Sequence, residues 1–561
     1  MIGKKGRGME EFDYIIVGAG SAGCVLANRL SEDRDCSVLV LEAGGRDWNP
    51  LIHIPLGTGK LVRSRLHGWG YYTEPEPHLD NRELFWPRGK VVGGSSSVNS
   101  MIYIRGHPRD YDQWAQLGNS GWSFADVLPY FKRSEGHESR SGVRHGTAGP
   151  LTVSRSSSDN PLYKAFVDAC LQAGHPACDD FNGESQHGAG RYDFTIRNGR
   201  RCSAAVAYLH PALDRDNLTL RVRALTKRVL LEGGRAVGIE YIQGGSVKTA
   251  RARREVLLAG GALNTPQVLM LSGIGDADDL KSVGVEAKHQ LPGVGKNLQD
   301  HLDVPVQHAC TQPVTLHSLV RVDRAAIAML QAAMFRSGPA TSFPAEGGAF
   351  VHSRPGLERP DLQWHLLLGL GSKRVRIPLL SALNSDPLER EGFTCRICHL
   401  HPDSRGRLTL RSDDPRARVR IFANYLSADA DIAALRSGVK LARQMFEQAA
   451  FDPFRGEELA PGPDVRTDAE IDAWIRGIAE TIYHPVGTCK MGVDEMAVVD
   501  PELKVRGVEG LRVVDASVMP VLIGGNTNGP TMMIAEKAAD MIRGRDSLPA
   551  ETIPDMETAA A

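Results

Sequence analysis

A glycine-rich turn near the N-terminus constrains the fold of this chain more than any other segment. Gly18, Gly20 and Gly23 spell G-x-G-x-x-G, directly after an apolar run at 14–17 and directly before a helical pattern that ends near Leu30. In such a turn the first glycine permits a tight bend, the second lets backbone N–H groups approach a pyrophosphate, and the third lets helix and strand pack closely. The order of strand, turn and helix therefore predicts a βαβ dinucleotide-binding unit.

An acidic residue completes this unit. A second apolar run, 37–41, ends in Glu42, about 20 residues after the glycines, where a carboxylate can accept hydrogen bonds from ribose hydroxyls and disfavours a 2′-phosphate. A tight turn without a ligand is the alternative, and the joint presence of strand, helix and acid speaks against it. The motif alone leaves FAD and NAD equally open.

Composition and charge exclude several classes of protein. The 42% hydrophobic and 24% charged residues are typical of a globular chain, and the 59 glycines follow no G-X-Y period. Lysine and arginine total 66 against 67 acidic residues, so no overall field attracts nucleic acid or acidic membranes, although local patches stay open. The longest apolar runs fall far short of the roughly 18 residues of a spanning helix. A peripheral membrane contact is left open.

The cysteines and the N-terminus indicate the compartment. The chain has nine cysteines, an odd number, spread along its length, which is unlike a disulfide framework and favours free thiols in a reducing compartment. A basic start is followed by charged and polar residues where a signal peptide needs an apolar stretch. We therefore expect a cytoplasmic protein, with peripheral attachment at the inner face of the membrane left open and Met9 as an alternative start.

Several further segments, in order along the chain, carry a family resemblance. They are FDYIIVGAGSAGCVLANRL with LEAGG, GKVVGGSSSVNSMIYIRGHPRDYDQW, GGALNTPQVLMLSGIG with LPGVGKNLQDH, YHPVGTCKMG, VVDASVMP and GNTNGPTMMIAEKAADMI. Together they span about residues 12 to 545 and resemble the glucose-methanol-choline (GMC) oxidoreductases, a flavoprotein family. Several blocks in the family's order are far more specific than one glycine motif.

The resemblance implies an α/β fold of two interleaved domains. A Rossmann-like FAD-binding domain is discontinuous, because glycine-rich segments return near the C-terminus, and a second α+β domain built on an antiparallel sheet binds the substrate. The predicted boundaries are 12–155, 215–310 and 476–545 for the FAD-binding domain, 156–214 and 311–475 for the substrate-binding domain, and 1–11 and 546–561 for flexible termini.

The resemblance also assigns residues to FAD. Besides the first glycine loop and Glu42, it places the serine-rich loop beside the pyrophosphate and the flavin ring, and Asp515 near the ribityl chain; the loop residues are Gly93, Gly94, Ser95 and Asn99. Some members attach FAD covalently through a histidine of this loop. The corresponding position here is Val98, so we expect non-covalent FAD.

For the chemistry, the resemblance makes His484 the base that takes the proton of an alcohol while the hydride passes to flavin N5. Histidine suits this role because its unperturbed pKa lies near 6.5. The family's second active-site residue falls within GGNTNGPT, where we favour Asn528 over Asn526, whose amide can instead brace the turn.

The expected function is oxidation of a small primary or secondary alcohol to the aldehyde or ketone. The sequence leaves choline, aliphatic alcohols and polyols open as substrates, and a quinone, an artificial dye or O2 as the electron acceptor. An alcohol oxidase using O2 and a redox-inactive FAD-containing lyase or binding protein are the alternatives.

Two other signals are weaker. Cys395, Cys398 and His399 match the C-x-x-C-H pattern of haem attachment, but alternation predicts a strand, whose successive side chains point to opposite faces and cannot share one ligand; we predict no metal. Glu346 is either a structural acid or a carboxylate that favours a cationic alcohol. Trp69 and the tyrosines that follow it are either core or channel residues, and a basic run at 373–376 is taken as solvated surface.

Overall fold

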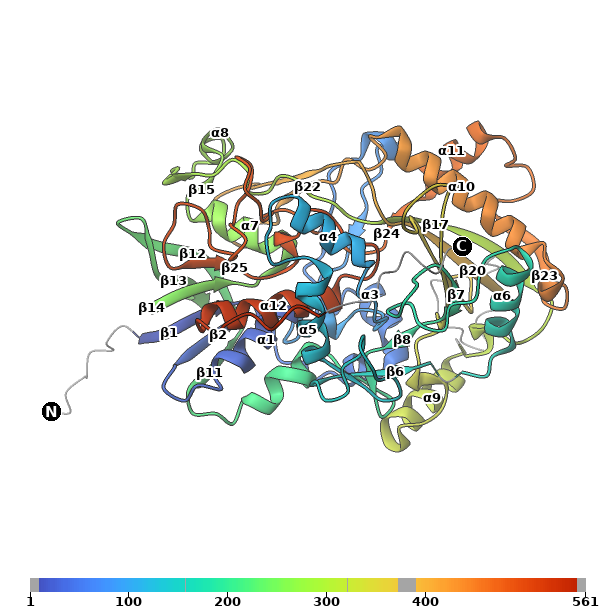
Figure 1. Cartoon of the computed structure of the whole chain (residues 1–561), viewed down its shortest axis with the longest axis horizontal. Coiled ribbons are helices and arrows are strands. Elements are labelled where there is room, and N and C mark those ends of the chain that lie inside the picture. The colour runs from blue at the N-terminus through green and yellow to red at the C-terminus, as the bar shows by residue number, and fades with distance from the viewer. Residues whose placement is uncertain (1–9, 157, 320, 372–389, 552–561) are drawn as a thin grey trace.

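The computed structural model describes residues 10–156, 158–319, 321–371 and 390–551. The alternative start at Met9, most of the two predicted flexible termini and the basic run at 373–376 lie outside these residues. Figure 1 shows an elongated molecule with two large sheets, one toward each end.

The first sheet contains the predicted βαβ unit. Its strand order is β11-β2-β1-β14-β13-β12, with β25 beside β14. Pairing among β11, β2, β1, β14 and β25 is parallel, whereas β12, β13 and β14 form antiparallel hairpins. The strands are β1 Glu10–Val17, β2 Val38–Glu42, β11 Leu218–Val222, β12 Ala224–Glu232, β13 Arg235–Gln243, β14 Ser246–Leu258 and β25 Leu511–Val513. The central strands are apolar runs because both faces of this part of the sheet are covered.

Helices from opposite ends of the chain cover this sheet. Helix α1 (Ser21–Leu30) lies against α12 (Asn528–Ile542), and α12 in turn contacts α5 (Phe124–Ser134). The ion pair between Arg29 and buried Glu536, 2.8 Å long, joins the first two helices. The C-terminal glycine-rich segments therefore return to the first sheet, as the sequence predicts for a discontinuous cofactor domain.

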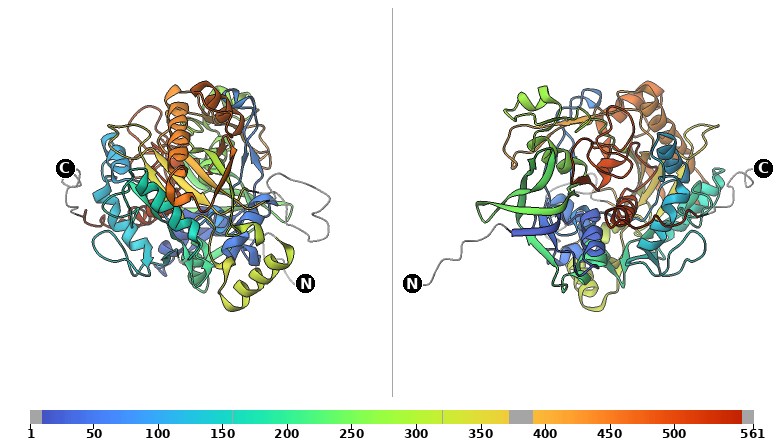
Figure 2. Two further views of the ribbon diagram at one scale, coloured as in Figure 1. Left: turned by 90° about the vertical axis from the view of Figure 1, so that its right-hand side faces the viewer. Right: turned by 60° about the vertical axis from the view of Figure 1, so that its left-hand side comes forward.

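The second sheet is antiparallel throughout. Its order is β23-β17-β20-β19-β18-β7, with β24 beside β17. The strands are β7 Gly188–Arg191, β17 Leu302–Cys310, β18 Gly347–Val351, β19 Leu362–Leu367, β20 Gly392–His399, β23 Arg455–Ala460 and β24 Glu480–Thr481, and the helices packed near them are α6 Pro161–Gln172, α10 Asp429–Phe446 and α11 Asp468–Ile478. In the left view of Figure 2, α10 in orange crosses the yellow strands of this sheet, and the right view shows the blue and green strands of the first sheet.

One boundary differs from the prediction. Residues 302–310 fall within the predicted FAD-binding domain, yet as β17 they pair with β20, β23 and β24 in the second sheet. The physical reason is long-range: the partners of this strand lie some distance further along the chain, so that no local pattern identifies its sheet. This strand becomes important for the site.

Shorter elements complete the chain. The small sheets contain β3 Tyr71–Tyr72 with β4 Phe85–Trp86, β5 Glu135–His137 with β6 Leu151–Arg155 and β8 Asp193–Phe194, β9 Ile196–Arg197 with β10 Arg200–Arg201, β15 Ile274–Gly275 with β16 His289–Gln290, and β21 Arg407–Thr409 with β22 Arg420–Phe422. The remaining helices are α2 Pro50–His53, α3 Thr58–Arg63, α4 Pro108–Gln116, α7 Gly261–Leu271, α8 Ala277–Lys281 and α9 Val322–Phe335.

The C-x-x-C-H segment is a strand, as expected. Cys395 and Cys398 lie in β20 and pack into different hydrophobic clusters, so their side chains do not meet at one ligand. All nine cysteines are free thiols. Part of the predicted flexible tail is held in place, because the backbone N–H of Leu548 donates to the Tyr130 hydroxyl (3.0 Å). Over the described ranges, every helix is too short or too polar to cross a bilayer.

Candidate active site

The first glycine loop has the geometry that a bound dinucleotide needs. Gly18 has a φ of +100°, which opens the tight turn after β1, and a Cβ at Gly23 would lie 1.8 Å from the Gly18 carbonyl oxygen. Only glycine permits that contact between helix and strand. A Cβ at Gly20, in contrast, would have no neighbour closer than 3.9 Å, so this glycine borders open space where a ligand can approach the backbone.

The serine-rich loop packs directly against the first loop. The Gly93 N–H donates to the Ala19 carbonyl (2.7 Å), and a Cβ at Gly94 would lie 2.7 Å from the Gly20 Cα. Ser95 lies in a short turn, Gly94–Ser97, and its hydroxyl accepts from the Gly89 N–H (3.2 Å). The two glycine loops thus form one continuous cradle.

A buried arginine fixes the far end of the serine-rich loop. Arg201 donates to the Asn99 carbonyl and side-chain oxygen, both at 2.7 Å, and to the hydroxyl of Thr58 (2.5 Å). Burial lowers the pKa of Arg201 to about 9. The predicted residue Asn99 is therefore an anchor of the loop, and Arg201 is a contributor that no sequence motif indicated.

Two buried carboxylates flank the cradle. Glu42 accepts from the N–H groups of Ala19 (2.9 Å) and Gly44 (2.7 Å), and burial raises its pKa to about 7. Asp515, at the end of β25, accepts from the Gly261 N–H and the Thr265 hydroxyl. Both acids organise loops at the carboxyl edge of the first sheet, which is where ligands bind in open α/β folds.

A cavity of about 580 Å³ begins at this cradle and reaches the second sheet. Its volume is in the usual range for small-molecule and cofactor sites. Residues that line it include Gly18, Gly20, Glu42, Gly94, Ser95, Val98, Asn99, His365, Arg396, His484, Asp515, Asn526 and Asn528. The structure therefore brings nearly all the sequence-predicted site residues to one cavity; Gly23 and Gly93 lie behind its wall.

His484 is held from two directions by consecutive residues immediately before β17. Its backbone N–H donates to Asp300 (2.7 Å), and its ring Nδ1 lies 2.9 Å from Nδ1 of His301. Asp300 also accepts from Thr481 (2.5 Å) and from the Tyr425 hydroxyl. The antiparallel pairing of β17 with β24 places these segments side by side, so the second sheet positions the predicted base.

The hydrogen bonds determine where the ring protons lie. Nε2 of His301 is 3.0 Å from the Leu400 carbonyl, which can only accept, so His301 carries its proton on Nε2 and leaves Nδ1 bare. His484 must then donate its own Nδ1–H to His301, which leaves Nε2 of His484 unprotonated. Burial holds the pKa of His484 well below its usual value, and His301 adds to this effect. His484 is thus a neutral imidazole whose unprotonated Nε2 can accept a hydrogen bond.

Asn526, and not the favoured Asn528, lies beside this nitrogen. Its amide Nδ2 is 3.2 Å from Nε2 of His484, and its Oδ1 accepts from Gln363 (3.3 Å), which orients the amide. Asn528 is the first residue of α12, where its side chain accepts from the Ser21 hydroxyl (2.7 Å). The geometry therefore favours the asparagine that the sequence interpretation assigned to the turn.

Other side chains set the character of the cavity. His365 is buried, and neither of its ring nitrogens has a hydrogen-bond partner; burial lowers its pKa to about 3. Trp69 also lines the cavity, whereas Tyr71 belongs to the hydrophobic core and does not line it. Glu346 does not line the cavity. Its carboxylate accepts from Arg191 (2.6 Å), which favours the structural interpretation of this acid.

The substrate end of the cavity holds an ion pair. Arg396 on β20 bonds both oxygens of buried Asp303, each at 2.5 Å, and lies 3.8 Å from the more exposed Glu480. All three residues line the cavity. The buried carboxylate of Asp303 is therefore already paired with an arginine.

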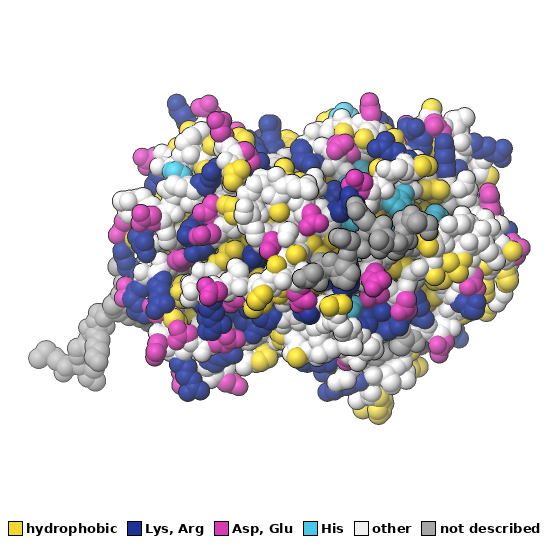
Figure 3. Space-filling view, in the orientation of Figure 1, with side chains coloured by type: hydrophobic (Ala, Val, Ile, Leu, Met, Phe, Trp, Pro, Cys, Tyr) yellow, Lys and Arg dark blue, Asp and Glu magenta, His cyan; other side chains and the backbone are white. Residues whose placement is uncertain are grey.

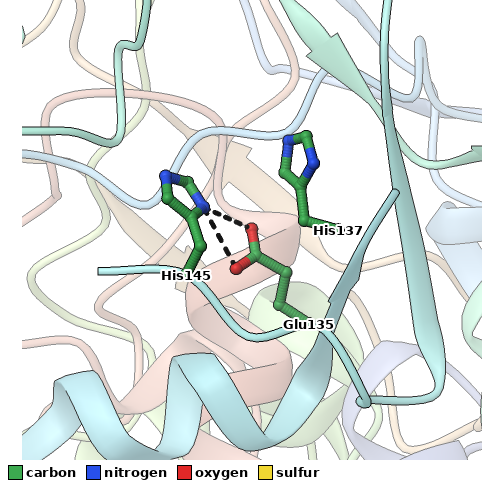
Figure 4. A group of neighbouring side chains, drawn as sticks. All are labelled: Glu135, His137 and His145. Carbon is green, nitrogen blue, oxygen red and sulfur yellow. Dashed lines mark hydrogen bonds and ion pairs between the residues drawn. The ribbon is translucent and has the colours of Figure 1, made fainter. Parts of the chain in front are cut away.

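A group of possible metal ligands lies elsewhere, at β5. Glu135, His137 and His145 approach one another, as Figure 4 shows. Their ligand atoms are engaged within the protein: Arg105 donates to Glu135 (2.5 Å), and the ring of His145 contacts both Glu135 (3.2 Å) and Asp180 (2.7 Å). With carboxylates on both nitrogens, His145 is the cationic centre of an ion-pair network.

Comparison with known proteins agrees with this geometry. The GMC oxidoreductase family models match residues 12–303 and 402–535. The chain is 47% identical to mitochondrial choline dehydrogenase of Mus musculus, over 98% of this chain and 92% of the relative. It is 48% identical to the oxygen-dependent choline dehydrogenase of Brucella ovis, over 96% of each chain.

Solved structures match over nearly the whole length. Pyridoxine 4-oxidase from "Mesorbium loti" superimposes with a TM-score of 0.85 and 31% identity, covering 95% of this chain and 100% of that one. Formate oxidase from Aspergillus oryzae, a structure on FAD modification, gives a TM-score of 0.87 and 26% identity, covering 95% and 98%. The chain therefore belongs to the GMC oxidoreductase family, as an FAD-dependent enzyme that oxidises alcohols.

Proposed function

We propose that this protein oxidises a small alcohol at the carbon that bears the hydroxyl, with His484 as the base and Asn526 as the residue that orients the substrate oxygen. The observation that carries the proposal is the bare Nε2 of His484, 3.2 Å from the amide nitrogen of Asn526, at a cavity continuous with the glycine cradle. A substrate hydroxyl that replaces this contact would donate to Nε2 and accept from the amide, since a hydroxyl group donates one hydrogen bond and accepts others.

The residues around the cradle fit FAD. The cradle leaves backbone open at Gly20, Gly94 joins the two loops, and Glu42 and Asp515 stand at the carboxyl edge of the sheet, so these residues would hold the cofactor. When bound, FAD supplies the hydride acceptor.

The protein supplies the proton chemistry. A substrate hydroxyl would donate to Nε2 of His484 while its oxygen accepts from the Asn526 amide. Because burial keeps the ring neutral, the base is available over the whole neutral range. General-base assistance is typically worth about 10² to 10⁴ in rate, and a positioned donor such as Asn526 about 10² to 10³.

We further propose that FAD is bound without a covalent link. Val98, which lines the cavity, has no nucleophilic atom at the position where some members carry the linking histidine. Acid precipitation should therefore release the yellow chromophore into the supernatant. Colour that stays with the denatured protein would contradict this assignment.

Choline is the first substrate to test, because the two relatives named above are choline dehydrogenases and the chain matches them over almost their full length. An uncharged alcohol is the second candidate. The specific observation in its favour is the pairing of Asp303 with Arg396, which leaves this carboxylate without an unpaired charge to offer a quaternary ammonium group.

The test is anaerobic mixing of the FAD-loaded protein with choline, straight-chain alcohols and polyols, with flavin bleaching as the readout. Bleaching together with aldehyde or ketone formation supports the proposal, and no bleaching by any alcohol contradicts it and leaves a lyase or binding role. Peroxide formation on admitting air identifies O2 as an acceptor and favours the oxidase alternative. Dye or quinone reduction without peroxide identifies a dehydrogenase.

Two matched variants test the residue assignments. Asn526→Ala should slow bleaching about 10² to 10³-fold, whereas Asn528→Ala, two residues away and bonded to Ser21, should change the rate much less while both keep FAD. The opposite ranking would restore Asn528 as the active-site asparagine.

A further inference from the structure

Helix α9 exposes large apolar side chains to solvent. Its large apolar residues face outward: Ile327 is 65% exposed, Leu330 59%, Met334 64% and Phe335 70%. Its buried residues are the small ones, Ala328 and Ala332, together with partly buried Met329. A surface helix normally places its large apolar side chains toward the core, so this helix has its hydrophobic face toward the outside. We call the four exposed residues the α9 patch.

The α9 patch forms one contiguous surface. Residues 327, 330 and 334 follow the three- and four-residue spacing that places side chains on one helix face, and Phe335 adjoins them. Figure 3 shows hydrophobic side chains at the lower edge of the molecule, where α9 lies in Figure 1. Single exposed apolar residues are ordinary, but a cluster on one short helix marks an interaction site.

Arginines surround the patch. Arg324 and Arg336 lie at the two ends of α9, and both are exposed. The β9–β10 hairpin packs on its C-terminal end, since a Cβ at Gly199 would lie 2.8 Å from the Arg336 carbonyl oxygen, and this hairpin adds the exposed Arg197 and Arg200. The only carboxylate in α9 and residues 196–201 is Asp323, which pairs with Arg321 (2.6 Å).

The chemistry of the surface identifies its partner. Large apolar side chains ringed by arginine are the features of helices that lie in the interface of a bilayer with anionic lipids. A second copy of this chain fits less well, because one 14-residue helix, about 21 Å long, offers little of the roughly 800 Å² per partner of a standard interface. A second copy would also bring the arginines of both copies together.

The position of α9 gives the contact a consequence for the site. Ala328 and Ala332 pack against Ile54, and a few residues further along the chain α3 contributes Val62 and Arg63 to the cavity wall. The α9 patch is therefore close to one wall of the active-site cavity. A bilayer bound there would lie near this wall.

We propose that the α9 patch docks this protein on the surface of a membrane that contains anionic phospholipid. The contact is peripheral: the helix lies in the lipid interface and the cavity stays in the protein. The proposal goes beyond alcohol oxidation and does not depend on it.

The test is sedimentation of the FAD-loaded protein with vesicles of phosphatidylcholine, with or without phosphatidylglycerol. The patch variant replaces Ile327, Leu330, Met334 and Phe335 by glutamine, which keeps helix propensity and removes the apolar surface. The control replaces Val143 and Val247, which are 62% and 54% exposed elsewhere on the surface, by glutamine. The charge variant is Arg324→Gln with Arg336→Gln.

We expect binding to the vesicles with phosphatidylglycerol that weakens in salt. The patch variant should bind about 100-fold less tightly or worse, each arginine removed should cost about fivefold, and the control should bind like the wild type. All variants should retain FAD and alcohol-dependent bleaching, so a failure of the proposed function would be seen separately. Equal binding of patch variant and wild type, no binding of the wild type to either vesicle, or a wild-type dimer that the patch variant abolishes would overturn the proposal.

Discussion

Replacing His301 tests whether a second histidine sets the proton position of the base. In the structure His301 accepts the Nδ1–H of His484 (2.9 Å) because its own proton is bound to the Leu400 carbonyl (3.0 Å). His301→Leu removes the acceptor and preserves an apolar filling of a fully buried position. The Nδ1–H of His484 then has no partner, and the tautomer with a bare Nε2 loses its advantage.

The size of the effect follows from the burial of the pair. An unsatisfied donor in the interior costs about 1 to 3 kcal/mol, which corresponds to about 5- to 150-fold in the population of the productive tautomer. We therefore expect flavin reduction by alcohol to slow about 10- to 100-fold in His301→Leu. The loss should be smaller than that of His484→Ala, which removes the base itself.

His301→Gln is the matched control. Its amide oxygen can accept from His484 while its nitrogen donates to the Leu400 carbonyl, so this variant should recover most of the rate. The assay is anaerobic stopped-flow reduction at saturating substrate, with FAD content and thermal unfolding measured for both variants. Wild-type rates in His301→Leu, or equal slowing in both variants at equal stability, would refute the tautomer argument.

Three further predictions concern the cradle, the cavity and the ion-pair network. Gly23→Ala should abolish FAD retention because its Cβ would meet the preceding loop at 1.8 Å, whereas Gly45→Ala, with nothing within 4 Å, should retain it; absorbance of the purified proteins decides. Arg396→Gln frees the carboxylate of Asp303, and unit charges about 5 Å apart interact by about 3 kcal/mol at an effective dielectric constant of 20. The ratio of kcat/KM for choline to kcat/KM for an uncharged alcohol should therefore rise tenfold or more at alkaline pH. An unchanged ratio would speak against a substrate site there. Burial lowers the pKa of His145, but hydrogen bonds to two carboxylates outweigh this effect and raise the pKa. The contribution of His145 to stability is therefore complete below about pH 6.5 and is lost as the pH rises through the folded-state pKa. Thermal unfolding measured against pH should show this loss, and His145→Asn should remove it.

The cofactor half of the fold could be predicted because its signals are local. The turn at Gly18 and the close packing at Gly23 require glycine at fixed spacing, and Glu42 follows at the end of the next strand. Such features depend on a few consecutive residues and on backbone sterics, so one sequence suffices to infer them. The same holds for the strand that contains Cys395 and Cys398.

The second half of the site depends on contacts between distant segments. Asn526 is favoured over Asn528 by its contacts with Gln363 and His484, which come from β19 and from the segment after β24. Both asparagines are chemically suitable, and they differ by two positions at the start of a helix. A turn of two residues more or fewer would exchange them, so residue type alone cannot rank them.

The proposed base is held by residues next to β17, the strand that the predicted boundaries assigned to the FAD-binding domain. Asp300 binds the backbone of His484 and His301 binds its ring, and both residues immediately precede β17, which pairs with β24. The base thus belongs mechanically to the second sheet, whereas the cradle belongs to the first. Their relative placement sets the distance between the proton acceptor and the place where FAD would lie. Substitutions that loosen β17 from β24 should therefore slow alcohol oxidation while the cradle retains FAD, and those that distort the cradle should release FAD while the His484–His301 contact persists.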